Sequence, residues 1–540
     1  MGIANTVWSR AQAWLVACLL GMAAAPFAHA ELGDNLLVDP VAMSLGNAVT
    51  ADPPGIASIH FNPAGLARIE ADTRSDSVSV VSIRNPNTFQ DASNIDIGGF
   101  KDDPLNNTHS GSVRQRLYLP IIGLLPWHMP ALVLPSLGLA FHQPNSPFTF
   151  GTMSYPTMGL SFDRSDPNDP AAYDGKLVDI ERIVYFSPTV GYKVSDTLRV
   201  GVGVPIAYGA LVVNTDMRMP NTLLGIIGKV QQGFCPNGEQ NVVDVFFFGL
   251  CGGGKNGMLN PFNKVANMNL ELTAPIDPTI NLGVLWEPVD WFALGAVLQG
   301  GTSTYYHGTY VIDAAPELRA FTYGLQHSLL GPLTAAITAM PASIPAVQSG
   351  HVVADIPFPT RVQLGVKLKP VSFLQFNMDV SYADWAKWNS LTMQFDQNIN
   401  LLEMARIFGI SNSSQLTLPV GARSVVNYSF GLQMQVTSDL ALRAGYEPRK
   451  SSIPGNQINL IAPLPNTKLM SLGLEYKLGN GASISVAGTL MKGSYNVPAR
   501  TDCNLNCDNF FNVVYNPYAA MNVEGTIIIR FFGVKFTKPF

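Results

Sequence analysis

Charge is scarce in this sequence. Only 13% of its 540 residues are Asp, Glu, Lys or Arg, roughly half the fraction found in a typical soluble protein. The formal net charge of -5 provides no basic surface for a nucleic-acid partner. Hydrophobic residues make up 47% of the chain. A folded surface with this composition suits lipid better than water.

A membrane-spanning helix is also missing from the sequence pattern. The most apolar internal stretch, Tyr118–Phe141, carries no charge when His128 is neutral, but prolines recur through it. Each proline inside a helix costs about 3 kcal/mol, so we predict strand, turn and strand here. The apolar run Ala13–Phe27 is shorter than the ~20 residues that a spanning helix needs.

The start of the chain is typical of a secretory signal peptide, which we assign to residues 1–30. Arg10 is its only charge, Ala13–Phe27 is apolar, and Ala28–Ala30 reads AHA, a small-x-small cleavage pattern. Cleavage after Ala30 leaves a mature chain that begins at Glu31. The protein is therefore expected to be exported.

Cysteine is rare, and cleavage of the signal peptide leaves Cys235, Cys251, Cys503 and Cys507. An even number in an exported chain favours disulfides, and proximity suggests Cys235–Cys251 and Cys503–Cys507. Other pairings stay open. A metal site is the alternative, but neither local pair of cysteines contains a histidine. We expect no metal and no cofactor.

Apolar and polar residues alternate through most of the remaining chain. The pattern is clear in Phe186–Val194, Leu198–Ala207 and Val362–Leu368. A period of two indicates strands with one apolar face. A soluble β-sandwich produces the same alternation, so this pattern alone does not separate the two fold classes.

The lengths of the connections favour a membrane barrel. Tight turns are expected at Val194–Asp196, Glu287–Asp290, Lys369–Val371, Thr437–Asp439 and Gly479–Gly481. Long irregular loops are expected near 211–265, 310–356, 399–423 and 496–522. Short turns on one side and long outer loops on the other are typical of transmembrane barrels.

We therefore predict an all-β fold, a transmembrane antiparallel β-barrel of about 14 strands. An unpaired backbone group in hydrocarbon costs several kcal/mol, so a sheet there must close on itself. The apolar face is expected to meet lipid and the polar face the lumen. The terminal Phe540 resembles the signal for the barrel assembly machinery. We expect a monomeric, multi-pass outer-membrane protein of a Gram-negative cell, in contact with lipid and lipopolysaccharide.

The segment Leu45–Ile69 reads LGNAVTADPPGIASIHFNPAGLARI. Its NPAGL motif resembles the N-terminal hatch of the FadL-type outer-membrane transporters of fatty acids and hydrocarbons. Tyr382–Phe395, Arg443–Pro454 and Pro463–Tyr476 resemble the same family in the same order. The resemblance implies a small hatch at 31–72 that plugs a barrel formed by 73–540. Pro53-Pro54, Lys468 and the long loops depart from the family pattern.

The NPAGL motif can also be interpreted from its residues. Asn62 can hydrogen-bond its own backbone, and Pro63 fixes φ near -65°, so both favour the start of a short helical turn. A surface turn without function is the alternative. By resemblance, the gate is assigned to Asn62, Pro63, Ala64 and Gly65. Replacing Asn62 and Pro63 is expected to slow uptake and to leave the barrel intact.

The resemblance implies uptake of hydrophobic small molecules, with long-chain fatty acids as the preferred substrate. Outer loops would capture the ligand, the lumen would bind it, and hatch movement would release it. The strand Ser154–Phe162 is the candidate for a lateral opening. Capture is assigned to Leu223, Leu224, Ile226, Ile227, Phe246, Phe247 and Phe248, which alternatively form a small loop core. Candidate carboxylate partners are Arg361, Lys367, Arg443 and Lys477, which alternatively pair with neighbouring acids.

Other functions stay open at this point. An uptake channel for aromatic or aliphatic hydrocarbons needs no cationic partner, and a general diffusion porin needs no hatch. A hydrolase is disfavoured because the chain has no G-x-S-x-G motif, and Asn35 occupies the nucleophile position of its GDNL stretch. We predict a transporter and not an enzyme.

Overall fold

The computed structural model describes residue 35 and residues 37–540. Within that range it leaves out 93, 112–113, 120–121, 165, 236–243, 245–248, 252–256, 334–340, 342, 409 and 509–514, and the side chains of 407–408. The predicted signal peptide lies outside the described residues. No described helix is long and apolar enough to cross a membrane.

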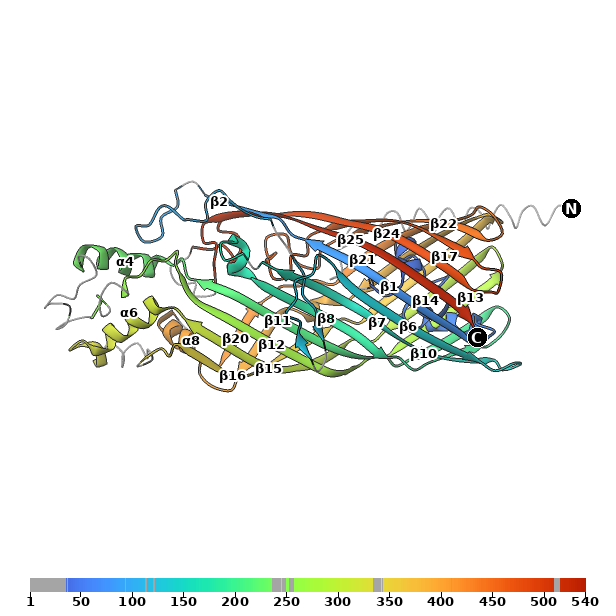
Figure 1. The fold of residues 1–540 in the computed structure, drawn as a ribbon, viewed down its shortest axis with the longest axis horizontal. Helices are drawn as coiled ribbons and strands as arrows, with labels where there is room; N and C mark the ends of the chain where they lie inside the picture. The colour runs from blue at the N-terminus through green and yellow to red at the C-terminus, as the bar shows by residue number, and fades with distance from the viewer. Residues whose placement is uncertain are drawn as a thin grey trace.

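Fourteen antiparallel strands close into a barrel that runs along the longest axis of the molecule (Figure 1). The ring closes because β25 pairs with β1 along the whole of Thr73–Arg84. Closure leaves no sheet edge exposed to hydrocarbon. In order around the ring, the strands are β1 (Thr73–Arg84), β6 (Leu132–His142), β7 (Phe148–Asp163), β9 (Thr189–Lys193), β10 (Leu198–Gly203), β13 (Asn281–Val289), β14 (Phe292–Gln299), β17 (Arg361–Val371), β18 (Leu374–Ala383), β21 (Val425–Gln435), β22 (Leu440–Arg449), β23 (Thr467–Lys477), β24 (Ser483–Val497) and β25 (Met521–Pro539).

A second, open sheet continues one side of this barrel, and we call it the outer sheet. It starts from the second half of β7, which pairs with β8. Its other strands are β8 (Leu177–Phe186), β11 (Ile206–Arg218), β12 (Lys264–Pro278), β15 (Thr302–Ala314), β16 (Val347–Phe358), β19 (Ser390–Phe395) and β20 (Gln415–Pro419). The short strands β2 (Asn87–Asp91) and β3 (Thr108–Ser110) extend the opposite side along β25.

The two ends of the barrel differ in their connections (Figure 1). The tight turns and the C-terminus lie at one end, while the long connections gather at the other. The strands run farther than the sequence predicted, since β11 extends to Arg218 and β15 extends to Ala314. The long connections carry α4 (Thr222–Phe234), α6 (Pro316–His327), α8 (Asn400–Met404) and η7 (Ala405–Phe408), and shorter ones carry η3 (Pro170–Asp174) and η6 (Trp385–Lys387).

Around the closed barrel, the side chains alternate as the sequence predicted. On β13, Leu282, Val284 and Trp286 are exposed on the outside, while Asn281 and Gly283 are buried inside. Exposed aromatic residues collect near the tight turns, as expected for a membrane interface. They include Phe141, Phe148, Trp286, Trp291, Phe373, Tyr476, Phe536 and Phe540. This apolar outer band faces lipid.

For the outer sheet, the prediction that the polar face of the strands meets the lumen is wrong. The inward residues are apolar, with Tyr306, Tyr310 and Ile312 of β15 buried in the largest hydrophobic cluster. Their outward neighbours include His307 and Asp313. The apolar face therefore turns inward where the sheet rises beyond the lipid-facing band, and the upper lumen has an apolar core.

The change of face occurs where each strand of the barrel passes into the outer sheet. The chain is interrupted there by Pro188, Pro205, Pro278, Gly300-Gly301 and Pro359. Proline cannot donate to a ladder and glycine tolerates bends, so both are expected at such breaks. At Pro278, Gly300-Gly301 and Pro359 the inward positions change from even to odd residue numbers, which moves the apolar side chains from the lumen side of the outer sheet to the lipid side of the barrel.

Candidate functional site

Asn35 and residues 37–69, which we call the N-terminal segment, pack against the inner face of the closed barrel (dark blue in Figure 1). They form α2 (Pro40–Ser44), η1 (Gly55–Ala57), α3 (Ser58–Phe61) and η2 (Pro63–Arg68). Asp39 caps α2 by accepting from the backbone N–H groups of Val41 and Ala42. Its carboxylate also accepts from Lys535 of β25 at 2.6 Å.

Inward-facing glycines of the wall make room for this segment. A Cβ atom added to any of them would lie within 3.2 Å of an atom of the segment. At Gly445, for example, it would lie 2.0 Å from the backbone nitrogen of Gly46. The set comprises Gly138, Gly151, Gly191, Gly201, Gly283, Gly295, Gly365, Gly431, Gly445, Gly473 and Gly533. These glycines form a belt on eleven of the fourteen barrel strands, against which the segment rests.

The side chain of Asn62 forms hydrogen bonds both within the N-terminal segment and to the barrel wall. Its Oδ1 accepts from the N–H of Ala64 at 3.2 Å, which caps η2, so the Asx-type turn forms as expected. Its Nδ2 donates to the carbonyl oxygens of Thr50 at 2.8 Å and of Val284 on β13 at 3.1 Å. Asn62 is fully buried. A surface turn is therefore excluded.

A charged cluster lies where η2 meets the wall. Arg68 pairs with Asp52 at 2.9 Å and with Glu287 of β13 at 2.6 Å, and Arg199 also pairs with Glu287. Lys367 lies 3.4 Å from both carboxylates. Burial alone would raise the pKa of Asp52, but the charges of Arg68 and Lys367 outweigh it and lower that pKa. The cluster is ionised at neutral pH and joins the segment to the barrel.

His60 occupies a buried position that the sequence did not single out. Its Nε2 lies 2.6 Å from Asn35 Oδ1, and its Nδ1 lies 3.3 Å from the hydroxyl of Tyr155. Burial, followed by the charges of Arg361 and Arg182, lowers the pKa of His60 to about 3. The imidazole is therefore neutral and acts as a hydrogen-bonding group within the packed segment.

An apolar pocket lies between the N-terminal segment and the upper wall. It is lined by Leu37, Met43, Val81, Met158, Gly159, Leu160, Ile180, Trp388, Leu464, Leu469, Thr489, Met491, Ile529 and Phe531. Its free volume is about 50 Å³, so a ligand must displace side chains to enter. Flexible methionine side chains permit such repacking.

Two polar atoms of the pocket lining have no protein partner within the described residues. They are Nε1 of Trp388 and Oγ1 of Thr489. A buried hydrogen-bonding group without a partner costs about 1–3 kcal/mol. A ligand that accepts a hydrogen bond would relieve that cost.

The wall is interrupted between β6 and β7, beside this pocket. β7 pairs with β6 up to Ser154, and a bulge between Pro156 and Met158 then directs it along β8. Within the described residues, no ladder joins Leu132–Ser136 to Tyr155–Phe162. We call this interruption the wall gap. The residues of β7 that follow the bulge line the pocket from the gap side.

The predicted carboxylate partners do not line the pocket. Lys367 belongs to the charged cluster, and Arg443 pairs with Glu475 of the neighbouring strand. Arg361 is buried on β17 near His60, and Lys477 is exposed at the end of β23. A cation that the sequence analysis missed lies closer: Arg182 is the strand partner of the pocket residue Met158, but it is paired with Asp277.

The predicted capture residues fall in two groups. Leu223, Leu224, Ile226 and Ile227 lie on α4, where Ile226 is exposed and the others are half-buried. Phe246, Phe247 and Phe248 lie outside the described residues. Disulfides join Cys235 to Cys251 and Cys503 to Cys507. The described residues contain no cluster of three His, Cys, Asp or Glu side chains suited to a metal ion.

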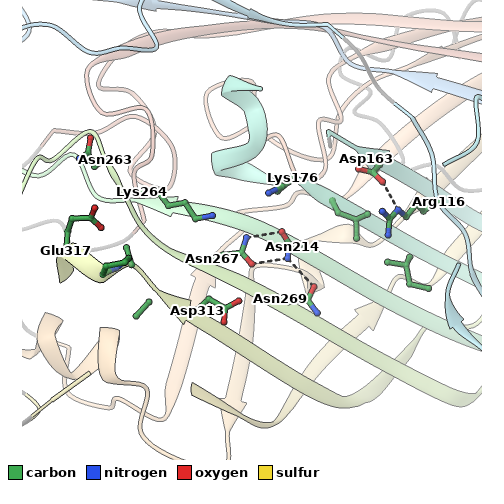
Figure 2. Close-up of a pocket in the computed structure, with 15 residues that line it drawn as sticks. Arg116, Asp163, Lys176, Asn214, Asn263, Lys264, Asn267, Asn269, Asp313 and Glu317 are labelled. Atoms are coloured by element: carbon green, nitrogen blue, oxygen red, sulfur yellow. Dashed lines mark hydrogen bonds and ion pairs between the residues drawn. The ribbon is translucent and has the colours of Figure 1, made fainter. Parts of the chain in front are cut away.

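A polar cleft of about 830 Å³ lies on the outer face of β11, β12 and β15 (Figure 2). Asn214 of β11 exchanges hydrogen bonds with Asn267 of β12 at 3.0 and 3.1 Å. The ion pair between Arg116 and Asp163 lies on one side of the cleft (Figure 2). These groups hydrogen-bond one another, and the cleft does not suit an apolar ligand.

Comparison with known proteins places these features in a family. Residues 22–540 match the model of the family described as outer membrane protein transport protein (OMPP1/FadL/TodX). No curated protein matches the chain significantly.

Several solved structures share the fold. A FadL homologue from Pseudomonas aeruginosa has a TM-score of 0.64 at 16% identity, over 94% of this chain and 100% of that chain. The toluene transporter TodX of P. putida has a TM-score of 0.59 at 13% identity, over 94% and 99%. The toluene transporter TbuX of Ralstonia pickettii has a TM-score of 0.55 at 14% identity, over 92% and 98%.

Members of the matched family are β-barrel channels that carry hydrophobic compounds through the outer membrane, and they are not enzymes. The family model covers nearly the whole chain, and the closed barrel of fourteen strands agrees with it. The chain therefore belongs to the FadL/TodX family of outer membrane transport proteins.

Proposed function

We propose that the protein imports long-chain fatty acids, with the N-terminal segment acting as the hatch. The apolar pocket between the segment and the wall gap carries this proposal. Burial of an acyl chain contributes ~0.8 kcal/mol per CH₂, which is sufficient to draw a fatty acid from water into such a pocket. The fatty acid then leaves sideways through the wall gap into the membrane.

The polar atoms of the pocket favour a ligand with a head group. Trp388 Nε1 and Thr489 Oγ1 can both donate a hydrogen bond, and both lack a protein partner in the described part of the chain. Burial in apolar surroundings favours the neutral form of a carboxylic acid. A protonated carboxyl group can accept these bonds, whereas a plain hydrocarbon leaves the two groups unpaired.

Binding of oleic acid and of an alkene with the same carbon skeleton tests this preference on the purified protein. The double variant Trp388→Phe/Thr489→Val removes both donors and keeps an aromatic ring at position 388 and a branched side chain at position 489. We expect its affinity for oleic acid to fall about fivefold for each lost hydrogen bond, at about 1 kcal/mol per bond. Its affinity for the alkene should not change. Equal losses for both ligands would contradict a role in head-group recognition.

Uptake of aromatic hydrocarbons is the second candidate. It is favoured because no described residue that lines the pocket carries a charged side chain. Uptake of labelled oleate and labelled toluene by cells with and without the protein separates the two candidates. We expect the protein to accelerate oleate uptake more than toluene uptake, and the reverse result would replace the first candidate with the second.

A further inference from the structure

Residues Arg114–Leu119 and Ile122–Pro130 form two arms, which we call the external hairpin, and they bridge the two sides of the wall gap. β4 (Tyr118–Leu119) pairs with β5 (Gly123–Leu124) inside it. On the β1 side, Gln115 Nε2 donates to the carbonyl oxygen of Ile83 at 2.7 Å. On the β7 side, Arg114 and Asp163 exchange two backbone hydrogen bonds of 2.8 and 3.3 Å. The hairpin therefore lies against the far end of the β7 edge that β6 leaves unpaired, from Ser161 to Asp163.

Two side chains of β7 hold the hairpin in this position. Ser161 Oγ accepts from the N–H of Arg116 at 3.0 Å and donates to its carbonyl oxygen at 2.8 Å. The Asp163 carboxylate binds Arg116 Nε at 2.6 Å and His128 Nδ1 at 2.7 Å. Arg116 lies on the first arm of the hairpin and His128 on the second, so Asp163 fixes both arms. Its side chain is only 3% exposed.

The faces of the external hairpin differ in their surroundings. Leu117 and Met129 pack against the apolar cluster that includes the pocket residues Leu37 and Met43. At its far end, Ile122 is 70% exposed and Trp127 is 66% exposed. The adjacent outward side chains of β6 form part of the lipid-facing band. Exposed Trp next to such a band is typical of a membrane interface.

We infer that the external hairpin is a lid that closes the wall gap, with Asp163 holding it shut and its exposed end lying in the outer leaflet. This inference rests on the proposed function, because it concerns the exit of the same ligand. Ligand that reaches the pocket leaves when Arg114–Leu117 separates from the edge of β7. Besides the packing of Leu117 and Met129 against the apolar cluster, the contacts that hold the hairpin are a few hydrogen bonds and ion pairs, which can break and re-form without unfolding of the barrel.

A reversible cross-link tests the lid. The double variant Arg114→Cys/Asp163→Cys places two cysteines at a hydrogen-bonded strand pair, where the Cα atoms lie about 5.5 Å apart. That separation falls within the range that disulfides span. We expect oleate uptake by the oxidised variant to fall to the rate of cells without the protein. Reduction should raise it above the wild-type rate, because the Asp163 carboxylate is missing. Wild-type protein under the same oxidant and reductant is the control.

A second cross-link holds the hairpin at another point and does not alter Asp163. The side chain of Tyr118 lies beside that of Tyr208 on β11, so Tyr118→Cys/Tyr208→Cys can be joined by a short bis-maleimide. We expect the joined protein to stop transport, while each single variant treated with the reagent still transports. If wild-type protein transports and neither cross-link changes the rate, the lid is wrong and the proposed function survives. If wild-type protein does not accelerate oleate uptake, both proposals fail.

Discussion

At the scale of single residues, Asn62 joins two parts of the N-terminal segment and also connects the segment to the barrel wall. The variant Asn62→Ala loses one cap and two hydrogen bonds to carbonyl oxygens. Because each hydrogen bond contributes about 1 kcal/mol, the free energy that keeps the segment docked in the barrel should fall by about 2–4 kcal/mol. We expect slower uptake and intermittent ion currents in planar bilayers, where the wild-type protein shows almost none.

The matched control for this variant is Asn480→Ala. Asn480 lies in an exposed tight turn, where its side chain caps only the N–H of Ala482. The control should keep the wild-type uptake rate, and both variants should keep a heat-stable barrel in gel electrophoresis. Unchanged uptake and conductance in Asn62→Ala would contradict a gating role for the N-terminal segment.

Residue-scale features differ in how far the sequence could reveal them. The turn at Asn62 was predictable because the side chain caps a backbone N–H only two residues away. The partner of Arg68 was not, since Glu287 lies 219 residues farther along the chain. The same limit applies to Asp163, whose partners on the external hairpin have no sequence motif. Contacts between distant segments follow from the register of the strands, which one sequence does not specify.

At the scale of elements, the glycine belt determines whether the N-terminal segment can dock. A Cβ atom at Gly201 of β10 would lie 2.3 Å from the carbonyl carbon of Pro63. Because the obstacle is backbone, the variant Gly201→Val cannot accommodate η2 in its present position. We expect trypsin to cleave after Arg68 in this variant and not in the wild-type protein. Limited proteolysis of the folded protein in detergent measures the difference.

Gly488→Val is the matched control for this substitution. Gly488 lies on the barrel strand β24, but a Cβ atom there has nothing within 4 Å. Both variants introduce the same side chain into a barrel strand, so a general loss of strand stability affects them alike. Equal resistance to trypsin in the two variants would show that the belt does not position the segment.

The strands themselves show what alternation can predict. The apolar faces of the closed barrel were predictable, because period two and tight turns are local features. The reversal in the outer sheet was not, because it depends on which breaks shift the register. Proline and glycine are present at those breaks, from Pro188 to Pro359. They indicate an interruption of the strand, but not the face on which the next strand places its apolar residues.

At the scale of the whole molecule, the apolar face of the strands points outward in the lower part of the barrel and inward in the upper part. The exterior of the lower part therefore suits lipid, and the exterior of the upper part suits water. The lower part has an apolar exterior around the N-terminal segment, and the upper part has a polar exterior around an apolar lumen. A hydrophobic ligand therefore encounters an apolar interior before it reaches the membrane. The wall gap lies where the two parts meet, since β7 passes there from the barrel into the outer sheet.

This division predicts the reactivity of cysteines placed along one hairpin of the barrel. Leu282→Cys lies on the lipid-facing side of β13, and His307→Cys lies on the outward side of β15. Both side chains are exposed in the isolated molecule, so only the membrane distinguishes them. In lipid vesicles, a water-soluble maleimide should label the cysteine at position 307 and leave position 282 unmodified. In denaturant, both should react. Protection of position 307 in vesicles would show that water does not reach the exterior of the outer sheet. That result would contradict the division of the barrel into a lipid-facing part and a water-facing part.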